Sequence, residues 1–170
     1  MSAYDYTIKG FLYQFNKSAL EILKAEDNDT VNIEGVIEDV EVVTPQATTC
    51  IQCKYHEASI GFTPSTIYKP LLQMLGHFAA HPTEEIEYVL FAHFPGAEEA
   101  PPSVGKPQCE DALASTDKAL KKFIEAIPST IDIDGFINKF TMEFGPSYDD
   151  LVTLVFKALE DNGMPVGEIE

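Results

Sequence analysis

The sequence predicts an α/β domain in which helices pack against the faces of a central sheet. Residues 7–25 place apolar side chains at steps of three and four, which is the period of a helix. Stretches typical of strands follow at 31–43 and 48–56, and the almost continuous apolar run at 85–94 is typical of a strand covered on both faces. A chain that mixes helices and strands in this way needs a sheet with helices on its faces.

The helix at 7–25 has one apolar and one polar stripe. The apolar stripe consists of Phe11, Phe15, Ala19, Ile22 and Leu23. The polar stripe consists of Gln14, Lys17 and Glu21. Side chains three and four positions apart lie on the same side of a helix, so each set forms a continuous row.

Three strands and a helix are expected next. Two short strands, at 31–35 and 36–43, are separated by a tight turn near Gly35, and a third strand covers 48–56. A helix follows at 62–81, and its second proline is expected to bend or restart it.

The second half of the chain predicts helices, one strand and a long loop. Residues 95–108, with four prolines, form the loop, and 109–127 form a helix. A helical turn at 132–140 leads into a short strand at 141–144. The closing helix at 147–163 begins with a capping serine and ends at a glycine suited to a left-handed stop.

The charge of the chain limits what it can bind by itself. It has 28 acidic residues, 11 lysines and no arginine, which gives a net charge of −17. Because cationic side chains that displace counterions supply most of the affinity for nucleic acid, the isolated chain is expected to bind DNA weakly.

Three cysteines and an N-terminus without a signal-peptide pattern favour a cytoplasmic location, and no apolar run reaches the ~20 residues of a membrane span.

Polar side chains on two neighbouring predicted strands suggest a site. Side chains alternate between the two faces of a strand, so Gln52 and Lys54 share a face, as do Asp39 and Glu41. If the two strands pair, a carboxylate, an amide oxygen and an ammonium group meet at one point. Mg²⁺ takes oxygen ligands, and a positioned lysine can orient a metal-bound water or stabilise negative charge, so this set suits phosphodiester hydrolysis. Additional carboxylates could come from Glu21, Glu34 and Glu38.

Three segments carry a family resemblance. "GFLYQFNKSALEIL", "IEGVIEDVEVV" and "CIQCKY" resemble the PD-(D/E)XK nuclease superfamily in the variant whose third motif reads QxK. The opening of the chain and "FINKFTMEFGPSYDDL" are similar to the N-terminal nuclease domain of the CD-NTase-associated antiphage endonucleases, which also occurs in Lamassu-type and related bacterial defence effectors.

The resemblance implies a restriction-endonuclease-like core with a central mixed sheet flanked by helices, and residues 1–170 as a single nuclease domain. Such domains usually precede a C-terminal sensing or assembly domain.

The implied activity is Mg²⁺- or Mn²⁺-dependent cleavage of double-stranded DNA by an antiviral defence effector. The implied catalytic residues are Glu21, Asp39, Gln52 and Lys54. The implied metal ligands are Asp39, Gln52 and the backbone carbonyl of Cys53, with Glu34 as an auxiliary ligand. We expect activation by homo-oligomerisation or by partner defence proteins, which would also supply the missing positive surface.

Other interpretations fit the same residues. Asp39, Gln52 and Lys54 could form an exposed sheet face with a salt bridge. The chain could be a catalytically silent, acidic interaction module of the same fold, which its charge favours, or an acidic mimic of DNA. The pair Cys50 and Cys53 is a weak zinc signal, because the two side chains of a straight strand would point to opposite faces.

Overall fold

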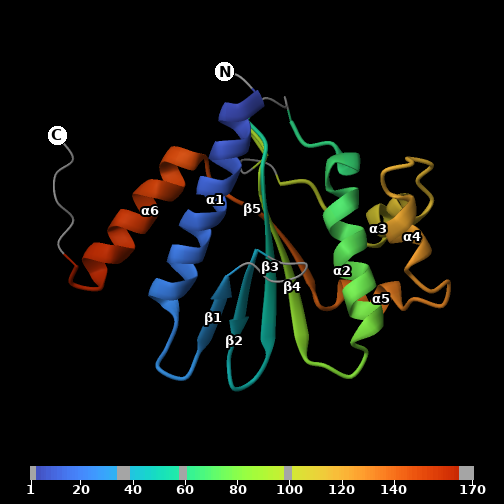
Figure 1. Ribbon diagram of the computed structural model, residues 1–170, viewed down its shortest axis with the longest axis horizontal. Coiled ribbons are helices and arrows are strands. Elements are labelled where there is room, and N and C mark those ends of the chain that lie inside the picture. The colour runs from blue at the N-terminus through green and yellow to red at the C-terminus, as the bar shows by residue number, and fades with distance from the viewer. Residues whose placement is uncertain (1–2, 34–38, 58–60, 98–100, 165–170) are drawn as a thin grey trace.

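A five-stranded mixed sheet with helices on both faces forms the protein (Figure 1). The computed structural model describes residues 3–33, 39–57, 61–97 and 101–164. The strands follow one another across the sheet in chain order, β1-β2-β3-β4-β5. Their bounds are β1 Thr30–Ile33, β2 Val40–Val43, β3 Thr48–Tyr55, β4 Ile86–His93 and β5 Phe140–Phe144. The first three strands pair with one another in antiparallel fashion, whereas β3, β4 and β5 run parallel.

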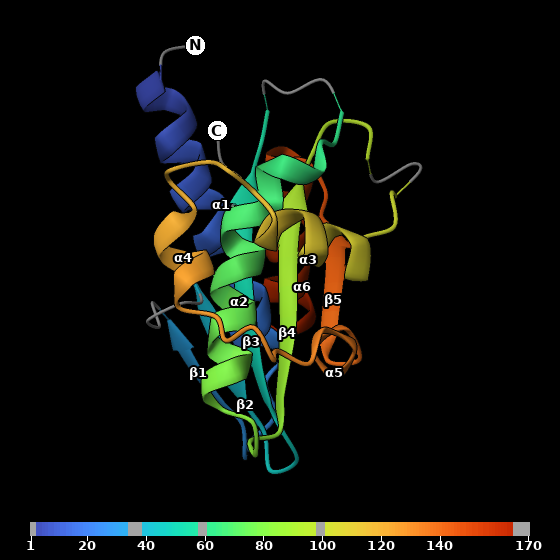
Figure 2. The same cartoon turned by 90° about the vertical axis from the view of Figure 1, so that its right-hand side faces the viewer.

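Each face of the sheet carries its own set of helices. Helix α1 (Ala3–Lys24) lies beside α6 (Tyr148–Asp161) on one face. The other face is covered by the elements that connect β3 to β5, as Figure 2 shows. These are η1 (Pro64–Ile67), α2 (Tyr68–Ala80), α3 (Lys106–Leu113), α4 (Lys121–Glu125) and α5 (Ile133–Ile137). None of the described helices combines the length and the hydropathy needed to cross a bilayer.

The alternation of side chains along β3 divides the core in two. Cys50 packs with the cluster beneath α2, which includes Leu71, Leu75 and Leu90. Ile51 and Cys53 instead belong to a smaller cluster beneath α1 and α6. The predicted opposite orientation of Cys50 and Cys53 is therefore confirmed, and both are buried free thiols.

The structure corrects the predicted helix at 109–127, which is two helices, α3 and α4. Side chains in the connecting segment bond to nearby backbone: Ser115 Oγ accepts from Asp117 N–H, and Asp117 Oδ1 accepts from Ala119 N–H. Such local bonds compete with the helical ladder, which the periodicity of apolar residues does not register. The first of the two helices also begins earlier than predicted, at Lys106.

Other predicted elements are close to those observed. The helix predicted at 62–81 starts as the 3₁₀ turn η1 and restarts as α2 at Tyr68, so that Pro70 stands in its first turn, where an amide donor is not needed. Ser147 caps α6 by accepting from Asp150 N–H, and Gly163 ends it with a φ of 73°. The turn predicted near Gly35 lies outside the described residues.

Helix α1 turns an unexpected side to the sheet. Phe11 and Phe15 of its apolar stripe are each 57% exposed, whereas an amphipathic helix normally buries such a stripe. The buried positions include Tyr13, Lys17 and Leu20. Tyr13 stacks on Phe91 of β4 with ring centroids 5.4 Å apart, so a large amphipathic aromatic fixes the rotation of the helix.

Candidate functional site

The candidate site lies where β2 separates from β3. Their first paired residues are Val40 and Ile51, and the backbone N–H of Asp39 donates to Ile51 O at 2.9 Å. Further along β3, the N–H of Cys53 donates to Oδ2 of Asp39 at 2.5 Å. A side-chain carboxylate therefore takes the place of a backbone acceptor at the edge of β3.

The carbonyl of Cys53 points toward the same edge. In an extended strand, the N–H and C=O of one residue face the same neighbouring strand. Cys53 N–H faces Asp39, as does the carbonyl of Ile51, whereas His56 donates to β4 on the other side. This geometry directs the Cys53 carbonyl, a predicted metal ligand, toward the side of Asp39.

Helix α1 and the end of β3 complete the surroundings of Asp39. The Gln14 side chain and the positive charge of Lys54 both favour the ionised form of the carboxylate. The pKa of Asp39 nevertheless lies above its ordinary value, because burial outweighs the opposing effects of the Cys53 N–H, Lys54 and Gln14. The favourable interactions around Asp39 are therefore not enough to offset the cost of burying its ionised carboxylate.

Two cavities meet at Gln14 and Phe11. One has a volume of about 230 Å³ and is lined by Thr7, Gly10, Phe11, Gln14, Cys53, Lys54 and Tyr55. The other, of about 30 Å³, is lined by Phe11, Gln14, Phe15, Ser18, Ile33 and Asp39. Lys54 thus lines the larger cavity and Asp39 the smaller one, which has room for about one water molecule.

Gln52 is the cross-strand neighbour of Asp39 in the register that pairs Val40 with Ile51. The Gln52 residue is 6% exposed. Its neighbour on β4 is Leu90, which belongs to the core cluster beneath α2, so the Gln52 side chain also lies on the α2 side of the sheet. No described residue donates a hydrogen bond to its buried Oε1. A buried acceptor without a donor is costly, so this oxygen is suited to a water or a cation.

Lys54 stands two residues after Gln52, near the end of β3. Its charge acts on Asp39 and also lowers the pKa of His56, after the larger effect of burial. The structure therefore brings Lys54 and Asp39 within electrostatic range of each other.

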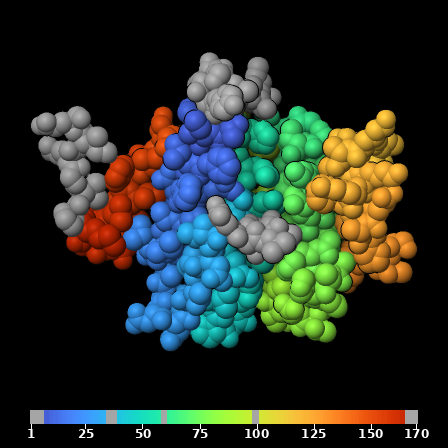
Figure 3. Space-filling view, viewed as in Figure 1, coloured from blue at the N-terminus to red at the C-terminus, as the bar shows by residue number. Residues whose placement is uncertain are grey.

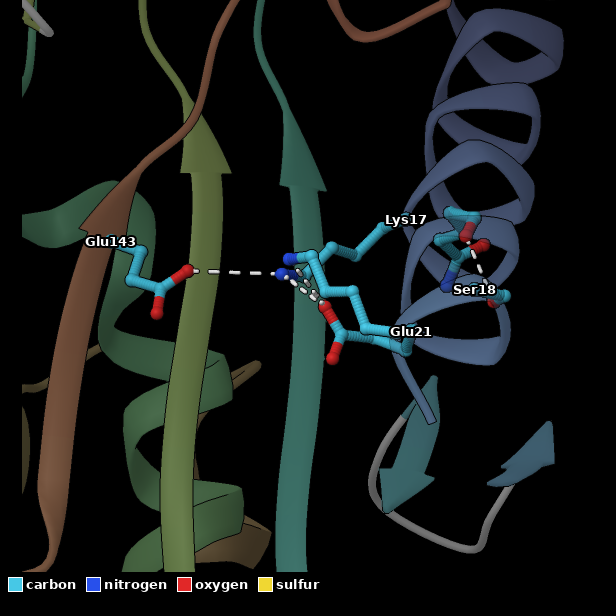
Figure 4. A network of polar contacts seen from close by, with 6 residues as sticks. Lys17, Ser18, Glu21 and Glu143 are labelled. Carbon is cyan, nitrogen blue, oxygen red and sulfur yellow. Dashed lines mark hydrogen bonds and ion pairs between the residues drawn. The ribbon is translucent and has the colours of Figure 1, made fainter. Parts of the chain in front are cut away.

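Glu21 belongs to a separate buried ion-pair network beneath α1 (Figure 4). Its Oε1 lies 2.8 Å from Nζ of Lys17, which also lies 3.8 Å from Oε2 of Glu143 on β5. The Lys17 ammonium stands 4.5 Å from the ring centroid of Phe91, and its side chain is 8% exposed. Glu21 is not among the residues that line the two cavities, so the structure does not join it to Asp39 there.

The Cys53 thiol is influenced by charges of both groups. Burial raises its pKa strongly, and smaller effects come from Asp39, Lys17, Lys54 and Glu21. Charged residues of the ion-pair network and of the candidate site therefore both act on Cys53.

Two polar residues of α1 gain importance from the structure. The sequence places Gln14 and Lys17 in a polar stripe without assigning them a role. In the structure, Gln14 lines the same cavity as Asp39 and favours its ionised form, and Lys17 is buried. A lysine in the middle of an amphipathic helix is usually exposed, whereas Lys17 pairs with Glu21 and its ammonium lies over the ring of Phe91, which is distant in sequence.

The predicted auxiliary residues Glu34 and Glu38 lie outside the described residues. Within the described part of the chain, no group of three or more His, Cys, Asp or Glu side chains is placed to hold a metal ion.

Comparisons with protein-family models, with curated proteins and with solved structures found no significant match for this chain.

Proposed function

We propose that this chain is a metal-dependent DNA endonuclease with a restriction-endonuclease-like core. It acts as the effector of a bacterial antiphage defence system, and partner proteins or oligomerisation activate it. The observation that carries the proposal is the placement of Asp39 at the point where β2 leaves β3, bonded to Cys53 N–H and close to Lys54. The order α1, β1–β3, α2, β4, with Asp39 and Gln52–Lys54 on adjacent strands, is the order on which the family resemblance rests.

Two oxygen groups at the edge of β3 suit a hard divalent cation, namely the Asp39 carboxylate and the Cys53 carbonyl that points to the same edge. Gln52 Oε1 is a buried acceptor without a described donor on the α2 side of the sheet, and its part in the same site is carried over from the resemblance. The raised pKa of Asp39 fits this assignment, because a cation would stabilise the ionised carboxylate. Mg²⁺ commonly binds through one or two carboxylates, and water and substrate phosphate complete its shell. When bound, Mg²⁺ would activate a water and neutralise charge on the phosphate.

The remaining side chains have separate roles in this proposal. Lys54 lines the larger cavity and stabilises negative charge on the phosphate or orients the attacking water. Gln14, which lines the same cavity as Asp39, favours the ionised form of that carboxylate. The resemblance proposes Glu21 as a catalytic residue. Its ion pair with Lys17 gives better support to a role in positioning neighbouring side chains.

Plasmid cleavage tests the proposal. The chain, with and without partner proteins, should convert supercoiled DNA to nicked or linear forms with Mg²⁺ or Mn²⁺ and not with EDTA. Lys54→Ala should abolish cleavage, whereas Lys121→Ala should retain it, because Lys121 pairs with an exposed glutamate on α4, away from the site. If Lys54→Ala cleaves like the parent under all these conditions, this site does not perform the reaction.

The second candidate function is a catalytically silent interaction module of the same fold. The net charge of −17 without arginine favours it, because such a surface repels DNA. In that case the parent chain should bind its partner proteins and leave DNA intact with either metal.

A further inference from the structure

A row of large apolar side chains is exposed along α1. It consists of Ile8, Phe11, Leu12, Phe15 and Ile22, together with Ile33 from the neighbouring β1, and we call it the exposed α1 face. Ile33 lies beside the helical row, because it lines the smaller cavity together with Phe11 and Phe15. Helix α1 is part of the surface seen in Figure 3, where it is drawn in blue. Contiguous apolar patches on soluble proteins commonly mark binding surfaces.

The area of this face approaches what one partner of a dimer buries. Its six residues are between 40% and 57% exposed. Taken together, they expose the equivalent of about three whole side chains, on the order of 600 Å² at roughly 200 Å² each. A standard protein interface buries roughly 800 Å² per partner, and the residues at its rim would supply the difference.

The spacing of the face suits another helix. Ile8, Phe15 and Ile22 are seven residues apart, and Phe11 stands three residues after Ile8. This is the heptad spacing by which one helix packs along a second. Because the row is centred on Phe15, a two-fold axis at Phe15 would bring Ile8 of one chain opposite Ile22 of the other.

Charge selects the occupant. None of the six side chains is charged, whereas the whole chain carries −17, so two copies can meet at this face without bringing charged side chains of the face together. Nucleic acid would gain no cation from it. Lys9, the lysine next to Ile8, is held in an ion pair with Glu57 at 2.6 Å. An antiparallel arrangement also separates the two exposed Lys24 side chains, which a parallel arrangement would place opposite each other.

We propose that the exposed α1 face binds a second copy of this chain, with the two α1 helices antiparallel about a two-fold axis at Phe15. Phe11 lines both cavities of the candidate site, and Phe15 lines the smaller one. The proposed interface therefore borders the candidate site.

Analytical ultracentrifugation over a concentration series tests the interface. The parent chain should reach twice the monomer mass, and Phe15→Glu and Ile22→Glu should each weaken dimerisation by roughly tenfold or more. Leu154→Glu is the matched control, because Leu154 is 45% exposed on α6 and outside the face, so this variant should dimerise like the parent. Circular dichroism should show that all variants are folded. A parent chain that remains a monomer throughout, or glutamate variants that dimerise like it, would overturn the proposal.

Disulfide trapping tests the arrangement. The native cysteines Cys50, Cys53 and Cys109 are buried, which keeps the background low. Under mild oxidation, Phe15→Cys should form a covalent dimer, and a mixture of Ile8→Cys with Ile22→Cys should form a mixed one. Ile8→Cys alone should remain monomeric under denaturing conditions. Efficient cross-linking of Ile8→Cys to itself would overturn the antiparallel arrangement.

Discussion

The Asp39 carboxylate accepts the backbone N–H of Cys53 at 2.5 Å, and it thereby extends the β2–β3 ladder with a side chain. The bond fixes the carboxylate in the plane of the sheet rather than on one of its faces. The acid, the Cys53 carbonyl and Lys54 are therefore held by one rigid strand edge, although they come from two separate motifs in the sequence.

Asp39→Ala should destabilise the folded chain by about 1–3 kcal/mol, because it leaves the N–H of Cys53 without its acceptor. Urea denaturation would measure the change. Thr153→Ala serves as a comparison, since it removes only an exposed hydroxyl that bonds within α6 and should change the free energy of unfolding by about 0.5 kcal/mol or less. Equal effects of the two substitutions would mean that the Asp39 bond contributes little.

Asp39→Asn should change the pH dependence of stability. Burial raises the pKa of Asp39 above its ordinary value of 3.8, so the folded state holds this proton more tightly than the unfolded state. The contribution of Asp39 to stability is therefore largest at low pH and is lost as the pH rises through the raised pKa. Because asparagine does not ionise, the free energy of unfolding of Asp39→Asn relative to the parent should increase over this window. A difference independent of pH would contradict the raised pKa.

Lys17→Ala should destabilise the chain by roughly 3 kcal/mol, because it leaves the mostly buried Glu21 carboxylate without its main partner. The double variant Lys17→Met with Glu21→Gln should recover much of that loss, since neither side chain is then charged. Chemical denaturation of the two variants measures both effects. Lys121→Ala breaks an exposed pair with Glu125 and should change stability by about 0.5 kcal/mol or less.

Gly145→Ala should destabilise the fold by about 1–3 kcal/mol through overpacking. A Cβ at this position would overlap the Tyr13 hydroxyl and come within 2.5 Å of the Phe91 ring, and both groups are buried beneath α1. Gly10→Ala is the matched control, because a Cβ there meets nothing within 4 Å. That change lies inside α1 and should stabilise the chain by up to ~1 kcal/mol. Thermal unfolding of the two variants should therefore shift in opposite directions.

The isolated chain should bind duplex DNA weakly and with steep salt dependence. Each phosphate that a lysine neutralises makes log affinity fall by a further ~0.9 per log unit of salt, and only eleven lysines are available against 28 acidic residues. Fluorescence anisotropy with a labelled duplex, with and without partner proteins, would measure this. Tight binding by the chain alone at high salt would contradict the expectation.

Local patterns predicted much of the fold. The apolar run of β4 and the alternation of β3 identify both strands to within about a residue, because a strand buried on both faces leaves a strong signal in composition. The break between α3 and α4 escaped prediction, since it depends on side chains bonding to backbone at Ser115 and Asp117.

The rotation of α1 and the site geometry were harder to predict. Tyr13 and Lys17 look compatible with solvent in the sequence, but both lie against Phe91, far along the chain. The shared face of Gln52 and Lys54 follows from strand alternation alone. The bond from Cys53 to Asp39 does not, because it requires a carboxylate to leave the pleat at the end of a strand.

The packing of α1 against α6 has a consequence for the order of events during synthesis. The Tyr13 hydroxyl donates to the carbonyl of Pro146, and Tyr13 shares a core cluster with Leu151. Helix α1 thus lacks part of its docking surface until Pro146 and α6 have been synthesised. A nascent chain that ends before these residues lacks contacts that hold α1, and with it Gln14, against the sheet.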